Sequence, residues 1–240
     1  QGIVDIGGTQ ILMQGGMNPE LPLGWYIELL SMIREKFPQV HIHAFSPPEV
    51  IEFVNFFNTE GDTLEDQVRW VLSRLQTAGL HSIPGGGGEI FAKAVREKIG
   101  LGKCDAKAWL TIMRVAHELG MNTSATMMFG HGETLAHRLQ HLEEIRLLQD
   151  RTRGFVSFIL WNFQPDNTPL GKKYPDRMEA EEYLRWLALS RVYLDNIDNL
   201  QVSWLTQGIE VGKTALRCGA NDLGSVMIEE NVIKPAGANN

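Results

Sequence analysis

Residues 40–46, Val-His-Ile-His-Ala-Phe-Ser, are the stretch that decides the fold of this chain. The first five residues form a short run that favours a β-strand, and polar residues gather from His43 to Ser46, where that strand would end. An amphipathic helix is predicted before it, because apolar residues recur at helical spacing over residues 23–37 until Pro38. A helix that leads into a short strand indicates one step of a repeating α/β fold.

The same alternation of strand and helix continues along the chain. Further helices are predicted over residues 63–79, 105–120, 134–148 and 178–196, the first of them opened by Thr63 with Asp66 three residues later. The predicted strands are residues 9–13, 40–44, 81–83, 123–128, 155–160 and 201–205. Short strands separated by helices predict βαβ units and a parallel sheet.

Polar or glycine residues follow every predicted strand. They are residues 14–16, 43–46, 84–89, 130–133, 162–167 and 206–208. An open doubly wound sheet gathers its ligand at a single switch point, whereas a barrel collects residues from all its strands at the carboxyl-terminal face. The sequence therefore predicts an α/β fold, a TIM-like (β/α) barrel that forms a single domain over residues 1–240.

The first eight residues, Gln-Gly-Ile-Val-Asp-Ile-Gly-Gly, are typical of the end of a helix and its glycine stop. No helix start precedes them in the sequence. We therefore expect the chain to begin inside the fold, as a partial barrel that lacks its first βα unit.

The composition excludes several classes of protein. A net charge of −7, with no basic stripe, argues against nucleic acid as a partner. No stretch approaches eighteen apolar residues and the first residues lack the pattern of a signal peptide, so we expect no membrane partner and a cytoplasmic location. Cys104 and Cys218 are too few for a disulfide framework and wrongly spaced for a metal-binding pair, which leaves buried or incidental thiols and no metal ligands.

Two glycine-containing motifs resemble nucleotide-binding loops and depart from them. The run Gly85–Gly88 lacks the G-x-G-x-x-G spacing, because Ile90 stands at the third glycine position. Residues 212–214, Gly-Lys-Thr, resemble the end of a P-loop, but Gln207 stands where that motif requires glycine. A nucleotide triphosphatase is therefore disfavoured.

Two pairs of histidines receive different interpretations. His41 and His43 alternate along a predicted strand, so both point to the same face, which in a barrel lies in or under the active site. A hydrogen-bonded core histidine is the alternative for His41, whereas His43, nearer the strand's end, is a candidate for substrate contact. His137 and His141 lie one helical turn apart without the glutamate of an H-E-x-x-H site, so surface histidines are expected there rather than zinc ligands.

Three segments have both a structural and a functional interpretation. Glu89 either caps the helix after the glycine run or hydrogen-bonds a ligand at the barrel rim. Residues 161–168 either form a plain turn or contact a planar, polar organic substrate. Residues 219–225 are either a helix end with its turn or an anion- or ribose-binding loop.

Taken in order, the motifs resemble those of one enzyme family. They are TQILMQGG at residues 9–16, HIHAFSPP at 41–48, SIPGGGGE at 82–89, ATMMFGH at 125–131, FQPDNT at 163–168, GAND at 219–222 and MIEEN at 227–231. This string resembles the cyclic dehypoxanthinyl futalosine synthases, radical S-adenosylmethionine (SAM) enzymes of menaquinone biosynthesis, over nearly the whole chain. Aminofutalosine synthases and the deazaflavin (F420-precursor) synthase subunits share the QGG and GAND themes, and the segments ILMQ, WLTQG and MIEEN favour the futalosine cyclase.

The resemblance implies a radical cyclisation of dehypoxanthine futalosine. In such enzymes a [4Fe–4S] cluster held by three cysteines binds SAM, and one-electron reduction of SAM yields a 5′-deoxyadenosyl radical. That radical takes hydrogen from the ribose of the substrate, and the sugar radical closes onto the benzoate ring. The barrel would hold SAM and substrate in line and exclude solvent, and an electron donor such as flavodoxin or ferredoxin is the implied protein partner.

The resemblance also implies roles for individual residues. Gln14, Gly15 and Gly16 correspond to the segment whose backbone holds the amino group of SAM, while Met17 stands where the usual acidic residue would follow. Glu89 is the candidate for a further contact to SAM. The candidates for substrate binding are His43, Ser46, Thr126, Gln164, Asn167, Thr206, Gln207, Asn221 and Asp222.

One element of the family is not found in this sequence. The C-x-x-x-C-x-x-C motif that holds the cluster follows the family's first strand, and Cys104 and Cys218 cannot replace three cysteines from one short loop. We therefore expect the chain alone to be inactive. The alternatives are another member of this radical SAM group, or a non-catalytic barrel without a cluster that binds a partner.

Overall fold

A computed structural model describes residues 1–15, 18–99 and 104–225 of the chain. The strands are β1 (Gln10–Met13), β2 (His41–Ala44), β3 (Ser82–Ile83), β4 (Asn122–Phe129), β5 (Phe155–Asn162) and β6 (Asn199–Val202). The helices are α1 (Gly2–Asp5), α2 (Leu23–Lys36), α3 (Pro47–Phe56), α4 (Leu64–Ala78), α5 (Lys93–Ile99), α6 (Ala106–Glu118), α7 (Leu135–Thr152), the short 3-10 helix η1 (Leu170–Lys172), α8 (Ala180–Tyr193), α9 (Trp204–Gln207) and α10 (Ile209–Ala215).

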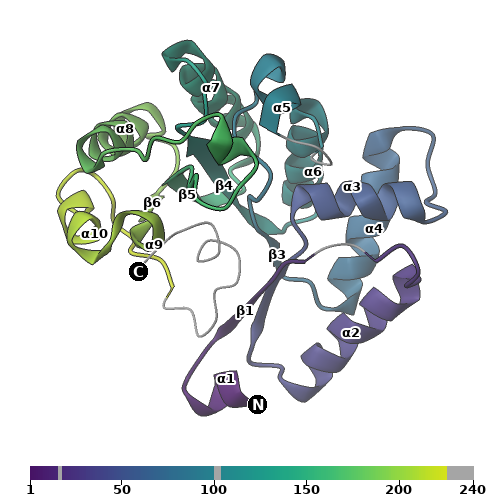
Figure 1. Ribbon diagram of the computed structural model, residues 1–240. Coiled ribbons are helices and arrows are strands. Elements are labelled where there is room, and N and C mark those ends of the chain that lie inside the picture. The colour runs from purple at the N-terminus through teal and green to yellow at the C-terminus, as the bar shows by residue number, and fades with distance from the viewer. Residues whose placement is uncertain (16–17, 100–103, 226–240) are drawn as a thin grey trace. The chain divides into compact units, whose positions relative to one another are not determined.

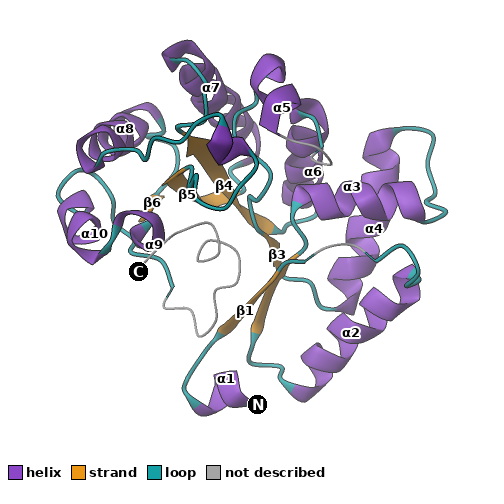
Figure 2. Cartoon of the chain, in the orientation of Figure 1, coloured by secondary structure: helices purple, strands orange, loops and turns teal. Residues whose placement is uncertain are grey.

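The strands form one sheet in the order in which they occur in the chain, β1-β2-β3-β4-β5-β6. The pairs β1–β2, β2–β3, β3–β4 and β5–β6 are parallel, and helices alternate with the strands (Figure 2). This order is that of a (β/α) barrel, whereas a doubly wound sheet reverses its order at a switch point. The predicted α/β fold with barrel topology is confirmed.

The sheet continues beyond β6 in the same sense. Asp222, which follows α10, forms a parallel bridge with Gln201 of β6. The backbone N–H of Val202 donates to the Asp222 carbonyl at 2.9 Å, and that of Asn221 donates to the Leu200 carbonyl at 3.1 Å. Residues 221 and 222 therefore occupy the next strand position of the sheet.

Most predicted boundaries agree with the structure, and the last strand differs. Thr63, Asp105 and Thr134 each cap a helix through their side chains, as expected from the sequence. The prediction of a strand over residues 201–205 is wrong at its end, because β6 ends at Val202 and α9 follows. The N–H of Ser203 donates to the hydroxyl of Tyr183 at 2.9 Å instead of to a neighbouring strand, which ends the ladder.

Contacts divide the chain into two compact units. Unit 1 comprises residues 1–87 and 102–123, and unit 2 comprises residues 88–101 and 124–240. In unit 1, α2 packs against α4, and α4 packs against α3 and α6 (Figure 1). In unit 2, α7 packs against α8, and α8 packs against β5 and α10. The single domain predicted for residues 1–240 stays a prediction.

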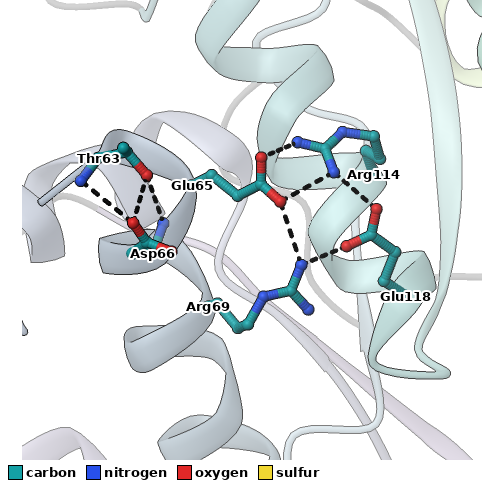
Figure 3. A network of polar contacts seen from close by, with 6 residues as sticks. All are labelled: Thr63, Glu65, Asp66, Arg69, Arg114 and Glu118. Carbon is teal, nitrogen blue, oxygen red and sulfur yellow. Dashed lines mark hydrogen bonds and ion pairs between the residues drawn. The ribbon is translucent and has the colours of Figure 1, made fainter. Parts of the chain in front are cut away.

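Helices α4 and α6 of unit 1 are joined by a network of ion pairs (Figure 3). Arg114 donates to both oxygens of Glu65, at 2.6 and 3.1 Å, and to Glu118 at 2.6 Å. Arg69 pairs with the same two carboxylates. These side chains are 29–41% exposed. The network therefore links the two helices at the protein surface, where salt screens its ion pairs.

The two faces of the sheet in unit 1 differ in how far their side chains are buried. Ile42 and Ala44 of β2 are 0% exposed and belong to the core. Side chains alternate along a strand, so His41 and His43 point to the opposite face. The strand register places Gln10 and Leu12 of β1 and Ser82 of β3 on that face as well. We call it the histidine face; its members are Gln10, Leu12, His41, His43 and Ser82.

The same alternation occurs in unit 2. Ala125, Met127 and Phe129 of β4 are 0% exposed, so Thr126 and Met128 point to the other face of the strand. No helix in the described ranges is both long and apolar enough to cross a membrane.

Candidate functional site

The segments that follow β1 and β2 in unit 1 meet at the carboxylate of Glu49, and Gly86, after β3, lies beside them. The Glu49 side chain, in the first turn of α3, accepts hydrogen bonds from the Gly15 backbone N–H at 3.1 Å and from the Ser46 N–H and hydroxyl at 2.8 and 2.7 Å. A Cβ atom on Gly86 would lie 2.8 Å from Nε2 of Gln14 and 3.3 Å from Cβ of Ser46, so a side chain there would crowd its neighbours. We call Gln14, Gly15, Ser46, Glu49 and Gly86 the Glu49 cluster.

The Glu49 carboxylate has capacity for one more hydrogen-bond donor. A carboxylate accepts about four hydrogen bonds, and three are supplied by the chain. Burial raises the pKa of this carboxyl group, although the hydrogen bonds from Ser46 and Gly15 act in the opposite direction. The carboxylate also lies at the amino terminus of α3, which favours a negative charge. The cluster therefore suits an ammonium or hydroxyl group of a ligand.

On the histidine face, two imidazole rings share one hydroxyl group. Oγ of Ser82 lies 2.6 Å from Nε2 of His41 and 2.6 Å from Nδ1 of His43. This shared contact confirms that the two histidines point to the same face. Burial, with the neighbouring His41, lowers the pKa of His43 to about 4, and burial lowers the pKa of His41. His43 is therefore neutral at pH 7.

In unit 2, Glu89 lies in an unusual backbone conformation before α5. It is 2% exposed, has a φ of +43°, and its carbonyl accepts the N–H of Met128 at 3.2 Å. Arg96 donates to the flanking carbonyls of Gly88 and Ile90 at 2.8 and 3.4 Å. Left-handed backbone is uncommon outside glycine and concentrates at functional sites. The capping interpretation of Glu89 is wrong, because α5 begins at Lys93 and its first turn holds no acidic residue.

The loop after β4 is held together by its own carboxylate. Glu133 accepts the N–H groups of Gly130 and His131 at 2.7 and 2.9 Å, and Arg138 donates to it at 2.7 Å. Burial alone would raise the pKa of Glu133, but the two backbone donors and His131 lower it overall. This loop therefore has a structural carboxylate that is ionised at neutral pH.

The carboxyl end of β5 holds two buried acceptor atoms. Oδ1 of Asn162 and Oε1 of Gln164 have no hydrogen-bond donor within the described part of the chain, and the two residues are 2% and 4% exposed. A buried polar atom without a partner is costly, and a donor on a ligand would satisfy it. This geometry supports the substrate role predicted for Gln164.

The segment after Gln164 forms both a turn and a pocket. The Thr168 hydroxyl donates to the Pro165 carbonyl at 2.9 Å, and Asn167 has a φ of +58°. The turn interpretation is therefore correct for these residues, while Trp161 belongs to β5. A pocket of about 470 Å³ is lined by Pro165, Asp166, Asn167, Thr168, Pro169, Gly171, Lys172 and Pro175.

The remaining substrate candidates make contacts within unit 2. Thr206 and Gln207 lie in α9, where the Thr206 hydroxyl meets Oγ of Ser203 at 2.9 Å. The Asn221 amide accepts the Leu200 N–H at 2.8 Å and donates to the Asp198 carbonyl at 3.0 Å, beside the amino end of β6. Asp222 accepts the N–H of Gly224 at 2.7 Å. The substrate roles of these residues, like that of Thr126 on β4, stay predictions. Gly16 and residues 227–231 lie outside the described residues.

The expectation of surface histidines on α7 is wrong for His141. Its ring is 0% exposed, Nε2 lies 2.9 Å from the Thr126 carbonyl, and the ring stacks on Phe91 with centroids 4.0 Å apart. Ile145 and Leu148 follow at helical spacing, so position 141 lies on the buried side of the helix. His137 is half-buried and belongs to the capping box at Thr134.

The described residues contain no group of three His, Cys, Asp or Glu side chains placed to hold a metal ion. Cys104 is buried and Cys218 is half-buried. These residues therefore do not fit an iron–sulfur cluster, which needs three converging thiolates.

The chain is similar in sequence to several known enzymes. Residues 152–240 match the family model of the CofH/MqnC C-terminal region. The chain is 44% identical to the cyclic dehypoxanthine futalosine synthase of Halalkalibacterium halodurans, over 99% of the chain and 62% of that protein. The chain is therefore similar to the futalosine synthases over nearly its whole length. It is also 39% identical to the aminodeoxyfutalosine synthase of Thermus thermophilus, over 97% of the chain and 61% of that protein.

The chain spans less than two thirds of the length of either protein. The resemblance inferred from its motifs is confirmed. Among solved structures, methylornithine synthase (PylB) superposes with a TM-score of 0.65 at 14% identity, over 90% of this chain and 56% of that one. At that identity the similarity shows the fold alone, and it agrees with the barrel topology of the sheet.

Two residues of the candidate site, Glu49 and Ser82, were missed by the sequence analysis. The signal for Glu49 is the segment Ser46-Pro-Pro-Glu49, which matches the capping-box pattern. Ser82 carries no motif of its own; only the pairing of β2 with β3 places it beside His41 and His43.

Proposed function

We propose that this chain forms the barrel part of a radical SAM cyclase that converts dehypoxanthine futalosine to cyclic dehypoxanthine futalosine in menaquinone biosynthesis. The observation that carries the proposal is the 44% identity, over 99% of the chain, to a synthase of that name. The aminodeoxyfutalosine synthase at 39% identity is the nearest rival activity among the relatives described above.

The chain's own groups fit SAM better than they fit the cluster. The Glu49 cluster offers a buried carboxylate that can accept one more donor, and a close approach at Gly86, which suit the ammonium group of SAM. SAM supplies the adenosyl group that takes hydrogen from the substrate. Because the described residues do not supply the cluster's ligands, we assign them no step of electron transfer.

In this proposal, residues of unit 2 bind the substrate. The unsatisfied oxygens of Asn162 and Gln164 can accept hydrogen bonds from sugar hydroxyl groups. Glu89 is held in a fixed position by the carbonyl contacts of Arg96 on either side of it. Fixed groups of this kind orient a substrate at no cost in reorganisation during the reaction.

A chimera tests the proposal on the chain as it exists. Residues 1–240 replace the matching segment of the Halalkalibacterium synthase, whose remaining sequence provides the cluster-binding segment that the resemblance implies. The chimera is reconstituted anaerobically with iron, sulfide and a reductant, and is then given SAM and dehypoxanthine futalosine. We expect the cyclic product with 5′-deoxyadenosine and methionine. The intact Halalkalibacterium synthase and the 240-residue chain alone are the controls.

The other outcomes contradict the proposal in distinct ways. Cleavage of SAM without the cyclic product indicates a different substrate. Formation of aminodeoxyfutalosine from its own precursors indicates the sister activity. A folded chimera that holds a cluster but leaves SAM intact, while the intact synthase turns over, favours a non-catalytic barrel.

A further inference from the structure

The contact of Ser82 with two imidazole rings restricts where the protons lie. A serine hydroxyl has one proton to donate and lone pairs to accept with. Since Nε2 of His41 and Nδ1 of His43 are each 2.6 Å from Oγ, the hydroxyl donates to one ring and accepts N–H from the other. Two arrangements satisfy this requirement. In the first, both rings carry their proton on Nδ1; in the second, both carry it on Nε2.

The two ends of this chain of hydrogen bonds lie in different surroundings. His43 is nearer the carboxyl end of β2, the end at which βα-barrels bind their ligands, and it is half-buried. His41 lies at the amino end of the strand and is exposed. We propose that His43, Ser82 and His41 form a proton path that links the ligand-binding end of the sheet to solvent at the other end.

Transfer of one proton along the path converts the first arrangement, with both rings protonated on Nδ1, into the second, with both protonated on Nε2. A proton from a bound acid binds Nε2 of His43, and the proton on Nδ1 of that ring passes to Oγ of Ser82. The original hydroxyl proton passes to Nε2 of His41, and the proton on Nδ1 of His41 leaves to water. One proton enters and one leaves, each residue ends neutral, and no electron is transferred.

The groups around the path leave it neutral in the resting state. The ring of His81 stacks on His41 with centroids 4.9 Å apart, and Nδ1 of His81 accepts the Ile42 N–H at 2.9 Å, so the proton of this third ring lies on Nε2. Arg34 of α2 is the charged side chain that acts on His81. The neighbours on β1, Gln10 and Leu12, do not titrate. A cationic resting ring is therefore disfavoured, and the exposed His41 is the ring that gains a proton as the pH falls.

Nitrogen NMR of the 240-residue chain tests the path without any enzymatic activity. The chain is labelled with 15N-histidine and titrated, and the resonances of His41 and His43 are assigned with single His→Gln variants. At neutral pH both arrangements exchange, so the two nitrogens of each ring average between protonated and unprotonated shifts. When His41 becomes cationic, its Nε2–H must donate to Ser82. We expect the proton of His43 to move to Nε2 at the same pH midpoint, with His43 still neutral.

Two substitutions at Ser82 separate a path from neighbouring but independent hydrogen bonds. Ser82→Thr keeps the hydroxyl and should keep the two midpoints equal. Ser82→Ala removes it, and His43 should no longer respond when His41 titrates. A His43 ring that does not respond to the titration of His41 in the unmodified chain overturns the proposal, and this result needs no Ser82 variant to fold. Equal midpoints in Ser82→Ala also overturn it.

The proposal rests on the proposed function only for the identity of the bound acid. Failure of the chimera to cyclise its substrate leaves the NMR result unaffected, and failure of the coupled titration leaves the chimera's product unaffected. The two inferences can therefore fail separately.

Discussion

At the scale of single residues, the carboxylate of Glu49 holds two segments of the candidate site together. The three donors that it accepts come from β1's end and from the start of α3. Replacement of Glu49 with Gln keeps the size but leaves one acceptor oxygen, so buried donors lose their partner. An unsatisfied buried donor costs about 1–3 kcal/mol. We expect E49Q to lower the free energy of unfolding by about that amount, measured by urea denaturation.

The matched control for this prediction is Glu52→Gln, which makes the same chemical change on the same helix at a less buried position. A loss of stability in E49Q no larger than that in E52Q would contradict the structural role of the Glu49 carboxylate.

His141 makes the stability of the chain depend on pH. Burial lowers the pKa of its imidazole to about 3, against the effect of the hydrogen bond to Thr126. The unfolded ring gains its proton near pH ~6.5, so the folded state resists protonation. The stabilisation is complete above that value and is lost as the pH falls toward 3, with a slope of up to ~1.4 kcal/mol per pH unit.

A substitution isolates this contribution. His141→Gln keeps an N–H for the Thr126 carbonyl and removes the titration, so stability should fall less steeply between about pH 6 and pH 4 than in the unmodified chain. His137→Gln, which makes the same chemical change in the first turn of α7, is the comparison variant. Parallel curves for the unmodified chain and H141Q, measured as urea midpoints at each pH, would show that another group causes the dependence.

Local patterns in the sequence predicted part of the site, and pairing between distant segments determined the rest. The shared face of His41 and His43 follows from strand alternation alone. The position of Ser82 depends on the register of β2 against β3, and the hydrogen bond that the Gly15 N–H donates to Glu49 joins residues 34 apart. Neither relation has a local signal. His141 was expected at the surface because its pair with His137 lacks the glutamate of an H-E-x-x-H site, although its spacing to Ile145 matched the apolar side of the helix.

At the scale of elements, capping signals explain where the helices begin. The hydroxyl of Thr63 donates to Asp66 at 2.6 Å and accepts the Asp66 N–H at 3.2 Å (Figure 3). Loss of an N-cap costs about 1 kcal/mol. We expect Thr63→Ala to lower the free energy of unfolding by about that amount, while Thr63→Ser, which keeps the hydroxyl, should stay close to the unmodified chain. Equal losses in the two variants, measured by thermal and urea unfolding, would exclude the cap as the cause.

Some elements had no clear signal in the sequence. Pro47 and Pro48 follow Ser46 and suggest a turn, yet they occupy the first positions of α3, where a missing N–H costs nothing. Helices α9 and α10 are short, and α9 begins directly after Ser203, whose N–H donates to the hydroxyl of Tyr183 of α8. Tertiary contacts therefore decided those boundaries, whereas amphipathic spacing was sufficient for α2, α4 and α6.

At the scale of the whole molecule, the order of the strands was predictable because alternation of strand and helix restricts a parallel sheet to few topologies. The polar residues after each strand selected the barrel order, and the sheet has that order. The division into two compact units could not be predicted, since it depends on how contacts are distributed and the sequence contains no linker.

The edge strand β1 affects how readily chains associate in solution. Among the described strands, β1 pairs with β2 alone, and its Leu12 is 49% exposed on the histidine face. An edge strand with unpaired backbone groups and an exposed apolar side chain promotes pairing between chains. A lysine at this position opposes that pairing through its charge. We expect Leu12→Lys to reduce aggregation, measured by light scattering during storage, with an unchanged circular dichroism spectrum.

Val192→Lys provides the comparison, because Val192 is 77% exposed on α8 and is not part of a strand. An equal improvement in V192K would mean that exposed apolar surface in general, and not the edge of the sheet, causes association. If L12K aggregates as the unmodified chain does while V192K does not, the edge of β1 is already protected in solution. A benefit confined to L12K would show that the open edge of the sheet controls association of this chain, and a chimera that covers this edge should then resist aggregation without the substitution.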